Sequence, residues 1–237
     1  MNILAVGAHP DDLELLCGGT LAKYSKKGHK IFMAHLCNGN LGGKDITPDQ
    51  LAEIRDKEAK KSGSLINAEV LGPIASDLDL YPTKEMRKEV VDIIRHARPD
   101  IIITHSPDDY MPDHTTTSKL VFDAAFTATL PNYKTKETFW EKITPIFYMD
   151  TSVGLKFQPD YYVDITEFFE IKKKMFLCHK SQYKWLKGHH LSDPLNIIET
   201  MGKFRGLQCG VLYAEGFVIE KVWGRVNPTE LISGITL

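Results

Sequence analysis

A short run of residues that can hold a metal ion follows the first apolar segment of the chain and reads His9-Pro10-Asp11-Asp12. An imidazole and a carboxylate three residues apart can converge on one cation, while Pro10 restricts the backbone between them. Neighbouring side chains in an extended segment point to opposite sides, so Asp11 would face a substrate if Asp12 binds the metal. The alternative is that an aspartate here only caps a helix that begins near Leu13.

A second polar loop, from His105 to His114, follows another apolar run and is dense in aspartates. His114 closes this loop beside Asp113, which is placed to orient the imidazole and fix its tautomer. Two histidines and one aspartate leave a coordination position open for water, as in a catalytic rather than a structural site. The sequence therefore predicts a divalent ion bound by His9, Asp12 and His114. For His105, a hydrogen bond within the loop is the simpler role.

The elements that must position these loops alternate between β-rich runs and helical patterns. Strands are expected at residues 2–8, 30–36, 68–71, 100–104 and 146–149, and helices at residues 13–27, 48–62 and 84–98. This alternation predicts an α/β fold with a mostly parallel, Rossmann-like sheet that helices cover on both faces. The C-terminal part is more mixed, with a strand at 161–165, a helix from 166 to about 179 and a segment at 211–223. No repeat or linker divides the chain, so residues 1–237 are expected to form a single domain.

Ligands of a parallel sheet bind where loops leave the carboxyl ends of its strands, and both polar loops stand at such ends. A dinucleotide-binding protein would carry G-x-G-x-x-G after the first strand, whereas the two carboxylates there would repel a pyrophosphate. Gly18-Gly19 lies farther into the first helical pattern, where close packing of helix and sheet is the simpler explanation. A nucleotide-binding or methyl-transfer enzyme is therefore the weaker alternative. A non-catalytic metal- or sugar-binding protein is the second alternative.

Composition and charge exclude several classes of protein. With 43% hydrophobic and 25% charged residues, the chain is typical of globular proteins, and its net charge of −2 offers no field to hold nucleic acid. The longest apolar runs fall far short of the roughly 18 residues of a membrane span, and the N-terminus lacks the pattern of a signal peptide. Four separated cysteines suit buried, reduced thiols. We expect a cytoplasmic protein. Whether it forms a homo-oligomer stays undecided at this point.

The residues of both loops resemble the LmbE-like or PIG-L family of N-acetylglucosaminide deacetylases, which includes deacetylases of mycothiol and bacillithiol biosynthesis. The specific part of the resemblance is the run from Ala8 to Asp12, continued by Glu14 and by Gly18 to Ala22. Individually weaker agreements follow in order: Arg55 with Glu58, Pro112 to His114, His179 with Ser181 and Gln182, and Ala214 to Phe217. The resemblance implies a Rossmann-like fold and a zinc-type ion held by the residues already proposed as ligands.

The resemblance also implies the reaction, which is removal of an N-acetyl group from a small sugar-linked substrate. Zn²⁺ or another divalent ion would activate water and polarise the amide carbonyl. Asp11 is then expected to take a proton from the water and to pass one to the leaving amine. Many family members carry a histidine three residues before the last ligand, where it helps to stabilise the oxyanion. This chain has Met111 there, so Tyr110 is a candidate replacement.

Substrate contacts are expected from Arg55, Tyr110 and His179. For Arg55 the alternative is a salt bridge on the helix surface, and for His179 it is a favourable position for a cation at a helix C-terminus. Glu215 could pair with Arg55 or with Arg205, and the sequence does not decide between them.

Overall fold

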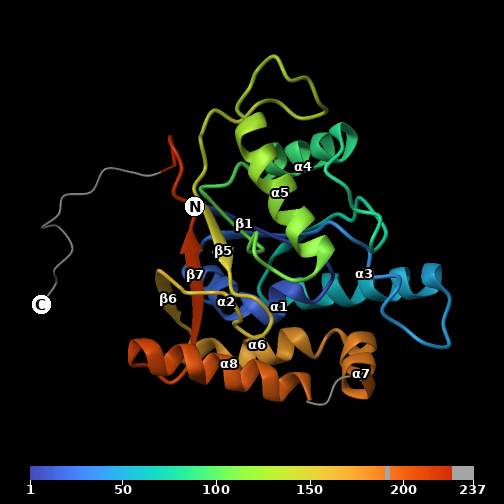
Figure 1. The fold of residues 1–237 in the computed structure, drawn as a ribbon, viewed down its shortest axis with the longest axis vertical. Coiled ribbons are helices and arrows are strands. Elements are labelled where there is room, and N and C mark those ends of the chain that lie inside the picture. Colours follow the sequence, from blue (N-terminus) through green and yellow to red (C-terminus); the bar gives the residue numbers. More distant parts are fainter. Residues whose placement is uncertain (190–192, 226–237) are drawn as a thin grey trace, which may run out of the picture.

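The structure is a computed structural model and describes residues 1–189 and 193–225 (Figure 1). Its strands are β1 (Asn2–Gly7), β2 (Lys30–His35), β3 (Glu69–Leu71), β4 (Ile101–Thr104), β5 (Ile146–Met149), β6 (Tyr161–Asp164) and β7 (Ala214–Ile219). Its helices are α1 (Asp12–Leu16), α2 (Gly18–Lys26), α3 (Pro48–Ser64), α4 (Lys84–Ala97), α5 (Pro112–Thr127), α6 (Phe169–Phe176), α7 (Lys180–His189) and α8 (Pro194–Cys209). A single 3₁₀ turn, Thr166–Phe168, precedes α6.

The strands form one seven-stranded sheet in the order β3-β2-β1-β4-β5-β7-β6. Strands β1 to β5 pair in parallel, and β7 runs antiparallel to both β5 and β6. The predicted α/β fold, with its mixed C-terminal part, is confirmed. Because β1 and β4 are direct neighbours, with Val6 opposite Thr104, their carboxyl ends bring the two polar loops together.

Alternate residues of each central strand supply two separate cores. Leu4 and Val6 of β1 pack on the side of α4 and α5, whereas Ile3 and Ala5 face α1, α2 and α6. Figure 1 shows α4 and α5 on one face of the sheet and α1, α2 and α6 on the other. This two-sided burial explains why the sequence of these strands is continuously apolar rather than alternating. Among the described residues, no helix is long and apolar enough to cross a membrane.

The expected helix at residues 13–27 is in fact two helices, which meet at Cys17 with φ −141° and ψ 10°. Gly18 begins the second helix, and a Cβ on Gly19 would lie 2.8 Å from the side chain of Ile165. Gly19 therefore does serve close packing, but against Ile165, which follows β6, and at a helix start that the periodicity alone did not reveal. Three further helices, α5, α7 and α8, were also not predicted.

All four cysteines are free, as expected, and three of them are buried. Cys209, at the end of α8, is exposed, so the expectation of burial is wrong for this thiol.

Glu215 of β7 stabilises the start of α2 rather than meeting either arginine that the sequence suggested. Its carboxylate accepts hydrogen bonds from the backbone N–H groups of Gly19 and Thr20, at 2.9 and 2.7 Å, and pairs with buried Lys172. Arg205 instead forms a two-point ion pair with Asp150. Glu215 thus joins strand β7 of the sheet to two helices.

We expect Glu215→Ala to lower the free energy of unfolding by about 3–5 kcal/mol, because it leaves Lys172 as a buried charge without its partner. Urea denaturation measures the change. Glu199→Ala, which removes an exposed ion pair with Lys203 on α8, is the matched control and is expected to leave the urea midpoint almost unchanged. Equal urea midpoints for both variants would contradict the structural role of Glu215.

Candidate active site

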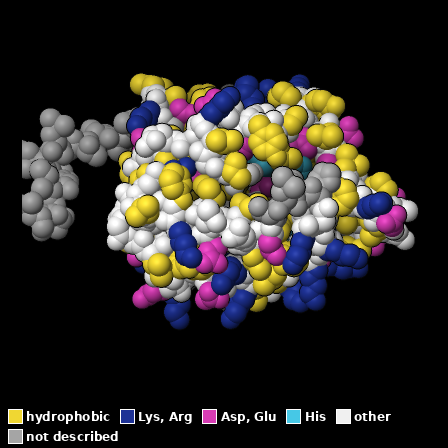
Figure 2. All heavy atoms as spheres, turned by 60° about the horizontal axis from the view of Figure 1, so that its bottom comes forward, with side chains coloured by type: hydrophobic (Ala, Val, Ile, Leu, Met, Phe, Trp, Pro, Cys, Tyr) yellow, Lys and Arg dark blue, Asp and Glu magenta, His cyan; other side chains and the backbone are white. Residues whose placement is uncertain are grey.

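A cavity of about 770 Å³ opens at the carboxyl ends of β1 and β4. Figure 2 shows this face, with histidine and acidic side chains at the floor of the hollow and hydrophobic side chains around it. Seven of the eight predicted site residues line the cavity: His9, Asp11, Asp12, Arg55, Tyr110, Asp113 and His114. The exception is His179, which is fully buried behind the lining.

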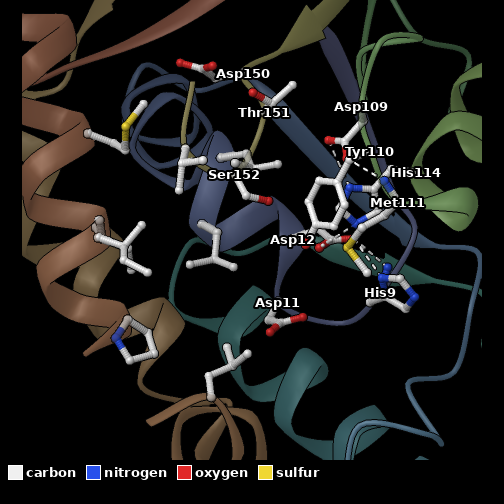
Figure 3. A pocket seen from close by; sticks show the side chains of 18 of the residues that line it. His9, Asp11, Asp12, Asp109, Tyr110, Met111, His114, Asp150, Thr151 and Ser152 are labelled. Atoms are coloured by element: carbon white, nitrogen blue, oxygen red, sulfur yellow. Dashed lines mark hydrogen bonds and ion pairs between the residues drawn. The ribbon is translucent and has the colours of Figure 1, made fainter. Parts of the chain in front are cut away.

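His9, Asp12 and His114 converge at the floor of the cavity. One ligand atom from each lies within 4.8 Å of the other two. The Asp12 carboxylate stands between the imidazoles, with Oδ2 3.5 Å from Nδ1 of His9 and Oδ1 3.4 Å from Nε2 of His114 (Figure 3). Nε2 of His114 is buried and has no hydrogen-bond partner in the described structure. This buried group of nitrogen and oxygen donors is consistent with a metal site.

Each of the two histidines is held by its own aspartate. Nε2 of His9 lies 3.0 Å from Oδ2 of Asp113, and Nδ1 of His114 lies 3.1 Å from Oδ2 of Asp109. The expectation that Asp113 orients His114 is therefore wrong. The two residues are consecutive at the start of α5, and consecutive side chains on a helix point about 100° apart. A proton on the nitrogen nearest each aspartate leaves the other nitrogen free to face Asp12.

The carboxylates around these imidazoles favour positive charge. Burial lowers the pKa of His114, but Asp12 and Asp109 outweigh it and raise the value to about 9. In the same way, Asp113 and Asp12 outweigh burial and raise the pKa of His9 to about 10. A shared cation would satisfy this negative field as well as two protons do.

His105 takes part in the same cluster, although the sequence favoured a hydrogen bond within its own loop as its role. Its ring stacks on that of His114 with 3.8 Å between centroids. Its Nε2 accepts a hydrogen bond from the N–H of Ala8 and lies 3.1 Å from Oδ2 of Asp12. His105 thus packs behind the cluster and ties β4 to the loop after β1.

Asp11 stands apart from the cluster, at the cavity side of the same loop (Figure 3). It occupies the N-cap position of α1, but its side chain makes no capping hydrogen bond, so the capping alternative is wrong. Its backbone has φ 125°, a strained value for a residue other than glycine, and such strain clusters at functional sites. Burial raises the pKa of Asp11 to about 6, although the Arg55 guanidinium opposes the shift.

Arg55 is buried on α3 and directed at the active-site loop, so the alternative of a surface salt bridge is wrong. Its Nη2 donates to Oδ1 of Asp11 at 2.8 Å and to the carbonyl of Pro10, and its Nη1 donates to the carbonyl of Gly39. With these partners, Arg55 fixes the position of the Asp11 carboxylate.

The other expected substrate contacts lie in different places. Tyr110 is 78% exposed at the cavity mouth, and Met111 lines the cavity as the N-cap residue of α5. His179 lies 3.0 Å from Oε1 of Glu14, which also accepts a hydrogen bond from Ser62 at 2.6 Å. The structure therefore places His179 in a buried network next to the site.

Sequence reasoning did not single out Asp109 or the Glu14–His179 pair. Asp109 precedes His114 by five residues across the irregular start of α5, a spacing that has no fixed geometry. The only feature of the sequence that pointed to Asp109 was the density of aspartates in the loop from His105 to His114. Glu14 and His179 lie far apart in the chain, so no local pattern connects them.

Comparisons with known proteins agree with this geometry. The family profile described as "PIG-L: GlcNAc-PI de-N-acetylase" matches residues 4–125. The chain is 29% identical to the diacetylchitobiose deacetylase of Thermococcus kodakarensis over 226 residues, which cover 91% of this chain and 81% of the relative. It superposes on N,N'-diacetylchitobiose deacetylase from Pyrococcus horikoshii with a TM-score of 0.80 at 27% identity, covering 92% of this chain and 83% of that one.

A second solved structure shows only the fold. GalB, the 4-carboxy-2-hydroxymuconate hydratase of Pseudomonas putida, superposes with a TM-score of 0.79 at 22% identity, over 97% of this chain and all of that one. The same architecture thus also supports a hydratase, and the fold by itself does not give the reaction. The family match is more specific, because it spans more than half of the chain and contains both polar loops. The chain belongs to the PIG-L family of de-N-acetylases.

Proposed function

We propose that this deacetylase of N-acetylglucosaminide-type substrates holds a divalent metal ion at His9, Asp12 and His114 and uses Asp11 as its general base. The observation that carries the proposal is the buried Nε2 of His114, which makes no hydrogen bond and faces the Asp12 carboxylate that it shares with His9. A buried nitrogen without a hydrogen bond is costly, and a metal ion would satisfy it.

The donor set fits Zn²⁺ best among common ions. Two imidazoles and one carboxylate, with a position left for water, are typical ligands of catalytic zinc. When bound, such an ion supplies an activated water and polarises the amide carbonyl. Asp113 and Asp109 support the site by orienting the two histidines.

Asp11 is placed to handle the protons of the reaction. Its carboxylate lines the cavity, is held by Arg55, and is not committed to capping a helix. In the ionised form it accepts a proton from the attacking water. It then returns a proton to the amine nitrogen, which would otherwise have to leave as an unstable anion.

The relatives support a small glycoside as the substrate, and the cavity is large enough for one. Its volume of about 770 Å³ lies within the usual range of small-molecule sites. The test is acetate release from N-acetylglucosamine and N,N'-diacetylchitobiose by protein stripped of metal and then supplied with Zn²⁺. Acetate formed only after Zn²⁺ is added supports the proposal, whereas equal turnover in the presence of excess chelator would overturn it.

Asp109→Asn is expected to weaken Zn²⁺ binding by about 10- to 100-fold, because a neutral amide orients the His114 imidazole less well than a carboxylate. Competition with a chromophoric chelator measures the dissociation constant. Asp108→Asn, at an exposed neighbouring position, is the matched control. Equal affinities in the two variants would contradict the role given to Asp109.

The acidic limb of the pH profile, which is the fall of kcat/KM on its acidic side, should report the ionisation of Asp11. With a pKa of about 6, Asp11 is protonated at lower pH and cannot accept a proton, so kcat/KM should fall as pH drops through this value. A cation on the neighbouring ligands also favours the carboxylate and places the limb of the loaded enzyme at or below pH 6. Arg55→Gln removes a charge that lowers the pKa of Asp11, so its limb should move to higher pH.

Profiles of kcat/KM at saturating Zn²⁺ for wild type and Arg55→Gln measure this shift. Lys60→Gln, an exposed change on the same helix, should leave the limb in place. A limb that moves to lower pH in Arg55→Gln, or does not move, would contradict the electrostatic link between Arg55 and Asp11.

A further inference from the structure

Beyond the site at its floor, the other half of the cavity carries a group of aliphatic side chains. The residues of this half come from α1, α7, α8 and the loop after β5, and we call six of them the aliphatic wall: Leu15, Val153, Leu155, Leu186, Ile197 and Met201. Figure 3 shows α8 across the cavity from His9, Asp12 and His114. A substrate whose amide reaches Asp11 therefore has room to extend toward this wall.

The chemistry of the aliphatic wall does not suit a second sugar. Its side chains offer no hydrogen bonds, and burying unpaired hydroxyl groups against them would be costly. The acetyl group of the substrate presents a single methyl, which needs far less apolar surface than six aliphatic side chains provide. Some other apolar part of the substrate must then account for the wall.

The two buried charged groups next to the aliphatic wall are already neutralised. Lys172 and Arg205 line the same half of the cavity, but each is buried against a carboxylate, Glu215 and Asp150 respectively. An anionic group on the substrate would have to compete with these pairs. The buried charges of this half therefore do not favour a charged ligand, whereas Lys156, which also lines the cavity, is exposed to water.

Two members of the aliphatic wall are unusually exposed. Val153 is 53% exposed and Leu155 is 71% exposed, although both line the cavity. A ligand chain that lies along the wall would remove their apolar surface from water, which is favourable in proportion to the area covered. The aliphatic wall is also continuous with the proposed active site, so one molecule can occupy both.

We propose that the substrate is an N-acetylglucosaminide with an aliphatic aglycone, whose chain lies against the aliphatic wall while the N-acetyl group reaches Asp11. This inference rests on the proposed function and adds a substrate class to it. Burial of each methylene of the aglycone should raise kcat/KM by about threefold to fourfold.

The experiment compares acetate release from methyl and octyl N-acetyl-β-glucosaminide, both below the micellar concentration, by the Zn²⁺-loaded protein. With four methylenes buried, the octyl glycoside should be favoured by about 100-fold in kcat/KM. Equal values for the two glycosides would overturn the inference while leaving the proposed function intact. No acetate from either glycoside would reject the proposed function, and the inference with it.

Two variants and one further substrate locate the octyl chain. Met201→Gln keeps the size of the side chain but makes it polar, and should reduce the octyl-to-methyl ratio about tenfold. Leu207→Gln is the matched control on α8, because Leu207 is 82% exposed and does not line the cavity, so the ratio should stay as in wild type. An unchanged ratio in Met201→Gln would overturn the placement. Faster release of octanoate from methyl N-octanoylglucosaminide than of acetate from the octyl glycoside would show that the wall holds an acyl chain instead.

Discussion

Asp11→Asn is expected to lower kcat by about 10²- to 10⁴-fold while leaving bound Zn²⁺ unchanged. Asparagine has nearly the shape of aspartate and tolerates positive φ, so the strained backbone at φ 125° should persist. It can still accept a hydrogen bond from Arg55 but cannot take a proton from water. Steady-state acetate release and metal analysis of the same preparation separate the two effects.

The contrast with Asp108→Asn makes this test specific. Asp108 lines the same cavity at an exposed position and has no assigned part in proton transfer, so its variant controls for a general change in cavity charge. A kcat of Asp11→Asn near that of wild type would reject Asp11 as the base. Loss of Zn²⁺ together with activity would instead place Asp11 among the ligands.

The central fold was predictable because its signals are local. Strands buried on both faces are apolar throughout, and the expected limits of β1, β2, β4 and β5 agree with the structure within one residue at each end. The helix break at Cys17 was not predictable, because it depends on Glu215 binding the start of α2 from almost 200 positions away. Helices α5 and α8 have low amphipathic contrast, so their periodicity in the sequence was weak.

The three proposed ligands and Asp11 could be selected from sequence because the order of strands in a parallel sheet brings their loops to one edge. The side chains that hold these four residues in place could not be selected from the sequence. Side-chain direction at the start of α5 decides that Asp113 serves His9 and that Asp109 serves His114. Arg55 shows the same limit, since helical spacing alone is compatible with an exposed ion pair and with its observed burial against Asp11.

His114→Ala is expected to weaken Zn²⁺ binding by more than the roughly 100-fold that loss of an orienting partner can cause, because a ligand itself is removed. Activity at limiting Zn²⁺ should fall with occupancy. His9→Ala and Asp12→Ala should show the same loss, since each leaves only two protein donors. Metal analysis after dialysis against a weak chelator measures occupancy in all three variants.

His114→Ala also leaves Asp109 and Asp12 buried without their imidazole partner, so a loss of Zn²⁺ could reflect unfolding rather than a missing ligand. His114→Gln separates the two causes, because its amide can still donate a hydrogen bond to one of these carboxylates but is a poor zinc ligand. His114→Gln should keep a cooperative thermal transition and lose Zn²⁺. His96→Gln, which changes a histidine paired with Glu69 on the surface, is the control and should keep both. Full Zn²⁺ occupancy in a folded His114→Gln would mean that Nε2 of His114 is not a ligand, and the proposed metal centre would then have to be rejected.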